Sequence, residues 1–241
     1  MAIRDAKGLI RGRIGEVVFK VVNGKQVMYQ VPEDVKQSML SKKSAKMFGV
    51  CSKQTSILMG RLRPWLGGKV DNRQAARLRG ACLGILKDND RRGVVSADLG
   101  TANMSDLKGF EFNIDAPFEK YFRGVIQITG EPTNGIQVVI PSFEPSLEIN
   151  FIKGCEAVDF HLLAIHYDFN DPGIIDAFHR VWSVSQNVEV DQERRFSIDP
   201  LTRPGITIIV VQLLFFRNTS KFGKEYLNDK KCFPAQIVYA R

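Results

Sequence analysis

The chain has 241 residues, of which 44% are hydrophobic and 25% are charged, and its formal net charge is +8. This composition permits a buried core and is typical of a globular protein. No run of residues approaches the ~20 apolar positions that cross a bilayer, and the first residues lack the apolar centre of a signal peptide. We therefore expect no membrane insertion and a location in the cytoplasm or in a larger particle or apparatus.

Two runs rich in β-branched residues predict a hairpin near the start of the chain. Residues 16–22 and 25–31 flank Asn23-Gly24, a pair typical of the type I′ turn because both central residues of that turn need a positive φ. A two-stranded hairpin is marginal alone in water, so we expect it to pack on a partner. The residues predicted to make this interaction are Val17, Phe19, Val21, Asn23, Gly24, Val27 and Tyr29.

Two amphipathic helices are predicted after the hairpin. The first begins near Ser38 or Ser41, either of which can cap it, and it ends at Pro64. The second begins after Asp71 and ends within residues 88–93. Apolar residues recur at helical spacing along both segments, which predicts an αα-hairpin. Together with the β-hairpin it makes up a basic region of residues 1–117.

From residue 124 onward the apolar pattern changes to a period of two. The candidate strands are residues 125–129, 136–140, 147–151, 157–168, 178–185, 196–198, 207–216 and 236–239. Strands of this spacing, separated by Gly and Pro turns, are typical of an antiparallel β-sandwich, Ig-like or of a related Greek key. The predicted fold class is α+β, with the β-hairpin and αα-hairpin followed by a sandwich domain of residues 118–241.

The sequence lacks the motifs that place a catalytic or metal site. It has no glycine-rich phosphate loop, no nucleophile elbow, and no H-E-x-x-H or C-x-x-C spacing. His161 and His166 point to opposite faces of one predicted strand and cannot share a metal. The cysteines, which are far apart, are Cys51, Cys82, Cys155 and Cys232. We expect no cofactor, no metal or disulfide, and no enzyme activity; only an active site built from distant residues stays open.

Positive charge is concentrated in the first half of the chain. Residues 1–123 hold 23 Lys and Arg against 12 Asp and Glu, whereas residues 124–241 hold 11 against 14. Such an asymmetry is informative about partners and not about fold. The predicted basic surface consists of Arg11, Arg13, Lys42, Lys43, Arg73, Arg77 and Arg79. Nucleic-acid phosphates and an acidic protein surface both fit this charge.

The opening segment resembles an uncharacterised bacterial domain family. Residues 12–19 read Gly-Arg-Ile-Gly-Glu-Val-Val-Phe, and an Asn-Gly-Lys turn follows at residues 23–25. Members of the family begin with Gly-x-x-Gly-x-Val-Val-Phe and a similar turn. The resemblance implies a bacterial origin, an N-terminal hairpin and a β-rich C-terminal half, and it implies no particular activity.

These observations predict a non-enzymatic structural, assembly or interaction protein. We expect a homo-oligomer or a larger assembly, such as a shell, fibre or appendage of bacterial or phage-like origin, that self-associates through the N-terminal hairpin region. The alternative is a nucleic-acid-binding protein that uses the basic helix pair.

Overall fold

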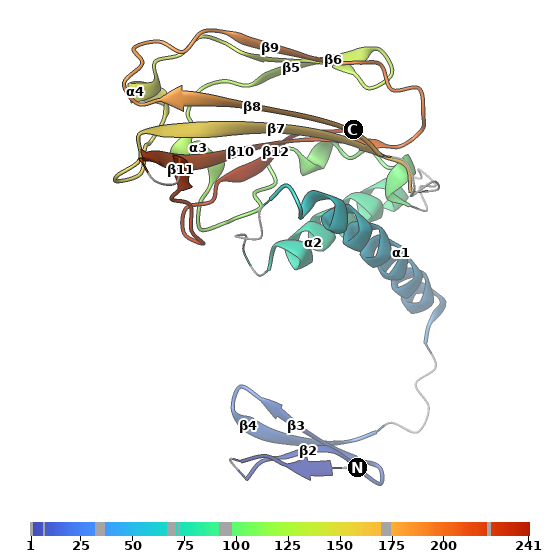
Figure 1. Cartoon of the computed structure of the whole chain (residues 1–241). Helices are drawn as coiled ribbons and strands as arrows, with labels where there is room; N and C mark the ends of the chain where they lie inside the picture. The colour runs from blue at the N-terminus through green and yellow to red at the C-terminus, as the bar shows by residue number, and fades with distance from the viewer. Residues whose placement is uncertain are drawn as a thin grey trace. The chain divides into compact units, whose positions relative to one another are not determined.

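The chain forms two compact units. The computed structural model describes residues 2–6, 8–31, 37–66, 71, 73–91, 98–169, 175–220 and 223–241. The units are Met1–Ser44 and Ala45–Arg241 (Figure 1). This division differs from the boundary expected at residues 117/118, because the helices share a core with the C-terminal strands: Leu58 and Leu78 lie in the same cluster as Leu163 and Ile208. Within the described part of the chain, no helix is both long and apolar enough to cross a membrane.

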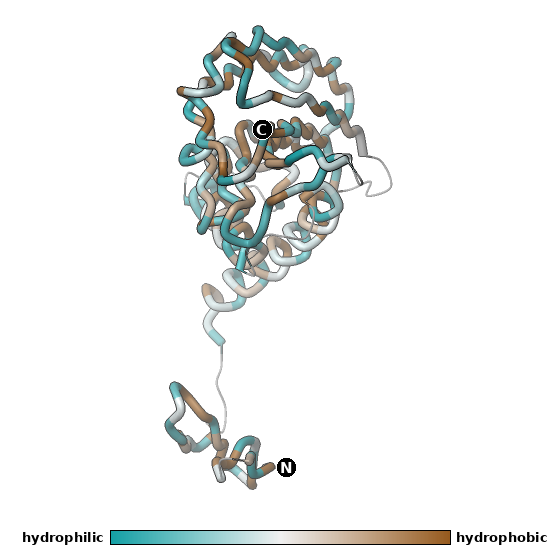
Figure 2. Tube along the Cα trace, turned by 60° about the vertical axis from the view of Figure 1, so that its left-hand side comes forward, coloured by the Kyte–Doolittle hydropathy of each residue, from teal (hydrophilic) through white to brown (hydrophobic). Residues whose placement is uncertain are grey.

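The N-terminal unit is built on a four-stranded antiparallel sheet. Its strands pair in chain order: β1 (Ala2–Arg4), β2 (Ile10–Ile14), β3 (Val17–Val22) and β4 (Lys25–Gln30). The predicted hairpin is confirmed as β3–β4, and Asn23 and Gly24 have φ angles of 50° and 77°, as a type I′ turn requires. Apolar residues are present along these strands (Figure 2).

The two long helices begin where the sequence predicts. Helix α1 (Met39–Leu62) follows Ser38, whose hydroxyl accepts a hydrogen bond from the Ser41 amide at 3.1 Å. Helix α2 (Gln74–Arg91) follows Asp71, whose carboxylate accepts a hydrogen bond from the Arg73 amide at 2.7 Å. These side chains satisfy amide groups that a helix start leaves without partners within the helix.

A five-stranded antiparallel sheet forms the centre of the larger unit. It consists of β7 (Ala157–Tyr167), β8 (Ile175–Ser185), β10 (Ile206–Thr219), β11 (Gly223–Tyr226) and β12 (Ala235–Ala240). The strand order is β11-β10-β7-β8, and β12 also pairs with β10. Alternation along β7 sends Leu163 and Ile165 into the core shared with the helices. Phe160 and Leu162 point into a second core on the other face.

A three-stranded sheet closes that second core. Its order is β5-β6-β9, with bounds Gln127–Glu131, Gly135–Ile140 and Arg194–Ile198. Val138 and Ile140 of β6 belong to the same apolar cluster as Phe160 and Leu213 of the larger sheet. In Figure 1 this sheet lies on the side of the five-stranded sheet that faces away from α1 and α2. The α+β class is confirmed, whereas the Ig-like topology stays a prediction.

Short helical turns occupy the remaining described segments. They are η1 (Leu99–Thr101), η2 (Ser105–Leu107), α3 (Phe118–Tyr121) and α4 (Pro145–Glu148). The strand predicted at residues 147–151 is wrong, because Pro145 starts a helical turn at this point. Proline has a φ suited to the first helical position, so the turn competes with an extended strand. Only Ile149 makes a β-bridge there, to Phe122.

Candidate functional site

The sheet of the N-terminal unit has no side chain buried within its own unit. Among the described residues from 2 to 31, every one is half-buried or exposed. Strand β4 is exposed along its whole length. A stable sheet normally packs one apolar face on another layer, and the described residues of this unit supply no such layer. Both of its faces are therefore candidate interaction surfaces.

The strand register sorts these side chains onto two faces. Directly opposed residues share a face, so Val17 lies with Ile14 on one neighbouring strand and Gln30 on the other. The apolar face consists of Ile10, Ile14, Val17, Phe19, Val21 and Met28, with Arg4, Gln26 and Gln30 on its edge strands. The basic face consists of Arg11, Arg13, Lys20 and Lys25 with Ile3, Val18, Val22, Val27 and Tyr29.

The residues predicted to interact are thus divided between the two faces. Val17, Phe19 and Val21 lie on the apolar face, whereas Val27 and Tyr29 lie on the basic face. Asn23 and Gly24 form the turn between the strands. Because side chains alternate along a strand, one partner surface cannot contact all of these residues through a single face of the sheet.

The predicted basic surface is also divided. Arg11 and Arg13 share the basic face, and the guanidinium Nε of Arg11 lies 3.6 Å from the Asp5 carboxylate. Lys42 and Lys43 are exposed near the start of α1, and Arg73 is exposed just before α2.

Arg77 was wrongly assigned to this surface. Its guanidinium lies 3.0 Å from the Asp71 carboxylate and donates to the carbonyl oxygens of Glu111 at 2.8 Å and Phe112 at 3.3 Å. These bonds tie α2 to the segment that follows it, because a guanidinium can donate in several directions at once. Arg79, two positions later, is half-buried.

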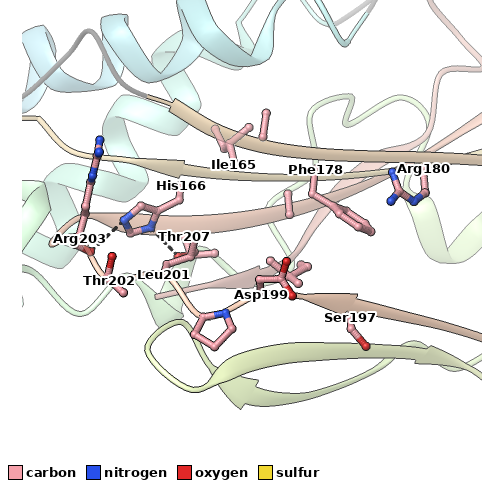
Figure 3. A pocket seen from close by; sticks show the side chains of 14 residues that line it. Ile165, His166, Phe178, Arg180, Ser197, Asp199, Leu201, Thr202, Arg203 and Thr207 are labelled. Carbon is pink, nitrogen blue, oxygen red and sulfur yellow. Dashed lines mark hydrogen bonds between the residues drawn. The ribbon is translucent and has the colours of Figure 1, made fainter.

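The larger unit contains a cavity of about 520 Å³ beside His166 (Figure 3). His166 Nδ1 lies 2.9 Å from the Thr207 hydroxyl, and its Nε2 lies 3.1 Å from the carbonyl oxygen of Arg203. This carbonyl accepts a hydrogen bond from Nε2–H, so the ring is anchored at both of its nitrogens. Thr207 is 1% exposed, which keeps its hydroxyl from a substrate. The pair therefore holds the 203–207 segment against β7 and lacks the exposed nucleophile that catalysis needs.

A glycine allows this segment to approach the strand so closely. Gly205 has a φ of 155°, and a Cβ at this position would lie 2.7 Å from the carbonyl oxygen of Tyr167. Arg180, which also lines the cavity, donates to the carbonyl oxygen of His179 at 3.0 Å and stacks over the Phe178 ring at 4.3 Å. Three of the polar groups that line the cavity, those of His166, Thr207 and Arg180, thus make contacts within the fold.

A buried carboxylate forms a second polar cluster on the helix-facing side of the large sheet. Asp159, only 1% exposed, accepts hydrogen bonds from Ser183 at 2.5 Å, Lys224 at 2.9 Å and Tyr226 at 2.8 Å. Lys224 Nζ also lies 3.0 Å from the Ser183 hydroxyl. A serine beside a lysine can be a nucleophile and its base, but here the lysine Nζ lies 2.9 Å from both oxygens of the Asp159 carboxylate. The cluster therefore fastens β11 to β7 and β8.

A pair of histidines lies next to this cluster. His161 Nδ1 is 3.2 Å from His179 Nε2, and the Trp65 ring centroid lies 4.7 Å from that of His179. Burial and, to a smaller extent, the neighbouring His179 lower the pKa of His161 to about 4. Within the described residues, no group of three or more His, Cys, Asp and Glu side chains could hold a metal ion. The sequence prediction missed this contact because it lacked the register between β7 and β8.

The lowered pKa of His161 predicts a loss of stability in acid. The unfolded chain binds a proton near pH 6.5, whereas folded His161 does so only near pH 4, so stability should fall as the pH drops through this interval. The expected loss is about 2–3 kcal/mol between pH 7 and pH 4.5, at ~1.4 kcal/mol per pKa unit. Urea unfolding at both pH values measures it, and His161→Gln should make the difference smaller. An unchanged difference in that variant would contradict the assignment.

No family model, curated protein or solved structure matches this chain. The resemblance of its opening segment therefore stays a prediction. The two faces of the N-terminal sheet and the polar clusters are the features that bear on function.

Proposed function

We propose that this protein is a non-enzymatic assembly protein that associates with other copies of itself through the apolar face of its N-terminal sheet. The observation that carries the proposal is that this face gathers two isoleucines, two valines, a phenylalanine and a methionine in a unit that buries none of them. Burial of one such side chain contributes about 1.5–3 kcal/mol. Covering several of them stabilises both the sheet and the complex.

A second copy is the partner that this surface favours. Two identical apolar faces related by a two-fold axis are complementary to each other, and two-fold dimers are the commonest homo-oligomers. Among the described strand residues, the apolar face has a single cation, Arg4 on the edge strand β1, and Arg4 Nε donates to the carbonyl oxygen of Gly8 at 3.2 Å. Two copies can therefore meet without placing several like charges together. The two-sheet region of the larger unit, for which we propose a sandwich, would be the rigid body displayed by the assembly.

The test compares matched substitutions on the two faces of the sheet. Val17→Lys with Met28→Lys places two cations on the apolar face, and Val22→Lys with Val27→Lys does so on the basic face. The exposed fractions are 37% and 65% for the first pair and 44% and 42% for the second. Light scattering during size exclusion, over a range of protein concentrations, should show that the first variant is monomeric and that the second keeps the mass of the unaltered chain.

Several results would contradict the proposal. One is a monomeric mass for the unaltered chain at every concentration tested. Another is an oligomer that survives the apolar-face substitutions, since charged side chains at the centre of an apolar interface are poorly tolerated. Equal dissociation by both variants would indicate that the sheet unfolds, and it would also contradict a role for one face.

The basic face supports a second candidate function, the binding of single-stranded nucleic acid. Its four cations share one face, on strands whose sequences contain no Asp or Glu. A row of phosphates would compensate the like charges gathered there. Tyr29 on the same face offers a ring for base stacking. This candidate replaces the helix pair as the expected site, because Arg77 is engaged within the fold.

Salt dependence tests the second candidate. The fluorescence anisotropy of a labelled single-stranded oligonucleotide should show binding that weakens steeply with salt, since each phosphate contact releases a counterion. Lys20→Gln with Lys25→Gln should weaken the binding and flatten its salt dependence. Lys42→Gln with Lys43→Gln, which removes the same charge from α1, is the control. Equal losses in both variants would mean that net charge, and not this face, determines the binding.

A further inference from the structure

A hollow of about 280 Å³ lies between α1 and α2, within the larger unit. Thr55, Ser56 and Gly60 of α1 line it, together with Arg63 just after that helix and Arg79 of α2. A Cβ built at Gly60 would meet no atom within 4 Å, so the hollow is open at this point. Small residues on the facing helices thus leave space where larger side chains would interlock.

The hollow contains two guanidinium groups and no carboxylate among its lining residues. The Nε atom of Arg79 is buried and has no hydrogen-bond partner among the described residues. An unpaired buried donor destabilises a fold by about 1–3 kcal/mol, and more when it is charged. Arg77, two residues earlier in the same helix, shows the usual solution, because it lies 3.0 Å from the Asp71 carboxylate. The Nε atom of Arg79 has no such partner among the described residues.

The ionisable thiol beside Arg79 does not supply the missing negative charge. Burial raises the pKa of Cys51, so this thiol is neutral at physiological pH. Its sulfur lies 3.8 Å from the Thr55 hydroxyl and 3.7 Å from the backbone carbonyl of Arg79, so it takes part in the neutral hydrogen bonding of the helix interface. Among the described residues that line the hollow, none offers a negative charge to the two guanidinium groups, so the hollow favours an anion from outside the chain.

We propose that this hollow binds a phosphate group through Arg63, Arg79 and the Ser56 hydroxyl. The planar guanidinium fork matches two oxygens of a phosphate, and charge-assisted bonds of this kind are stronger than neutral ones. The volume also favours a small anion. A water molecule occupies ~30 Å³ in the liquid, and pockets for drug-sized ligands measure about 300–1,000 Å³. The hollow holds a phosphate with a few waters, and any larger molecule that carries the phosphate extends into solvent.

The experiment uses the full chain and inorganic phosphate as the probe. Calorimetric titration with sodium phosphate, at an ionic strength held constant with sodium chloride, should show saturable binding. Arg79→Gln and Arg63→Gln should each weaken it about tenfold or more, as loss of a charge-assisted hydrogen bond implies. Arg79→Lys should also weaken it, because an ammonium lacks the fork. Arg73→Gln is the matched control, since Arg73 lies just before α2, is exposed and does not line the hollow.

A parallel titration with a nucleoside monophosphate distinguishes a free phosphate from one attached to a larger molecule. Binding of either probe that depends on both arginines supports the proposal. No saturation with either probe would overturn it, as would an equal loss in the Arg73→Gln control. If circular dichroism shows that Arg79→Gln is unfolded, phosphate binding by Arg63→Gln tests the proposal instead, because Arg63 is exposed. The site lies outside the N-terminal sheet, so its failure would leave the proposed self-association untouched.

Discussion

Phe160→Ala should lower the free energy of unfolding of the larger unit by about 3–5 kcal/mol, the usual range for removal of a buried aromatic ring. Phe160 is 0% exposed, and its ring stacks on Trp182 with centroids 5.0 Å apart. It also meets Phe122 edge to face at 5.1 Å and lies 6.3 Å from Phe143. Three rings from different segments therefore lose a shared neighbour when this one is removed.

Thermal or urea unfolding measures the loss, which corresponds to a decrease in Tm of about 6–20 °C for a unit of this size. Phe48→Ala provides the control, because Phe48 is a phenylalanine of α1 that is 47% exposed, and its removal should leave stability nearly unchanged. A small effect of Phe160→Ala would mean that the two sheets do not share the core described above.

Lys224→Met should destabilise the protein by about 2–3 kcal/mol at neutral pH. This figure is below the ~3–5 kcal/mol for a fully buried pair, because the Lys224 side chain is 42% exposed whereas that of Asp159 is 1% exposed. Without the ammonium, the buried carboxylate keeps only the hydroxyls of Ser183 and Tyr226. A buried carboxylate that has lost its cation is unfavourable because it is no longer solvated by water, and this is the physical reason for the expected loss.

Urea unfolding at neutral pH measures the loss. Arg217→Met is the control, because Arg217 of β10 and Glu225 of β11 form an ion pair at 2.8 Å, with both side chains about half exposed. An exposed pair contributes little, so this variant should change stability less than Lys224→Met. Equal losses of stability in the two variants would contradict the conclusion that the buried Asp159–Lys224 pair stabilises the fold more than an exposed pair does.

The sequence predicts the individual elements of this fold better than their packing. Asn23-Gly24 predicts the hairpin because its chemistry is local, and Ser38 and Asp71 mark helix starts for the same reason. Strands β1 and β2 were not predicted, since β2 carries Arg11 and Gly12 in place of a β-branched run. The shared core of helices and sheet was missed as well, because an apolar stripe on a helix does not say which surface covers it.

The candidate sites show the same limit. The alternation of side chains along β3 and β4 follows from sequence spacing, but the membership of each face depends on the register with β2. Arg77 carries the same charge as the neighbouring arginines. Only the fold shows that its guanidinium contacts the Asp71 carboxylate and two backbone carbonyl oxygens. The contact of His161 with His179 likewise depends on a strand pairing that no local signal fixes.

The central position of β10 has a consequence for the order of folding during synthesis. This strand pairs with β7 along one edge and with β12 and β11 along the other, and the amide of Phe112 donates to the carbonyl oxygen of Ala235. The larger unit cannot complete its sheet until residue 240 has left the ribosome. The four strands of residues 2–31 need only one another, so they can pair long before that point. The proposed association can therefore begin between nascent chains, before the body that each one carries has folded.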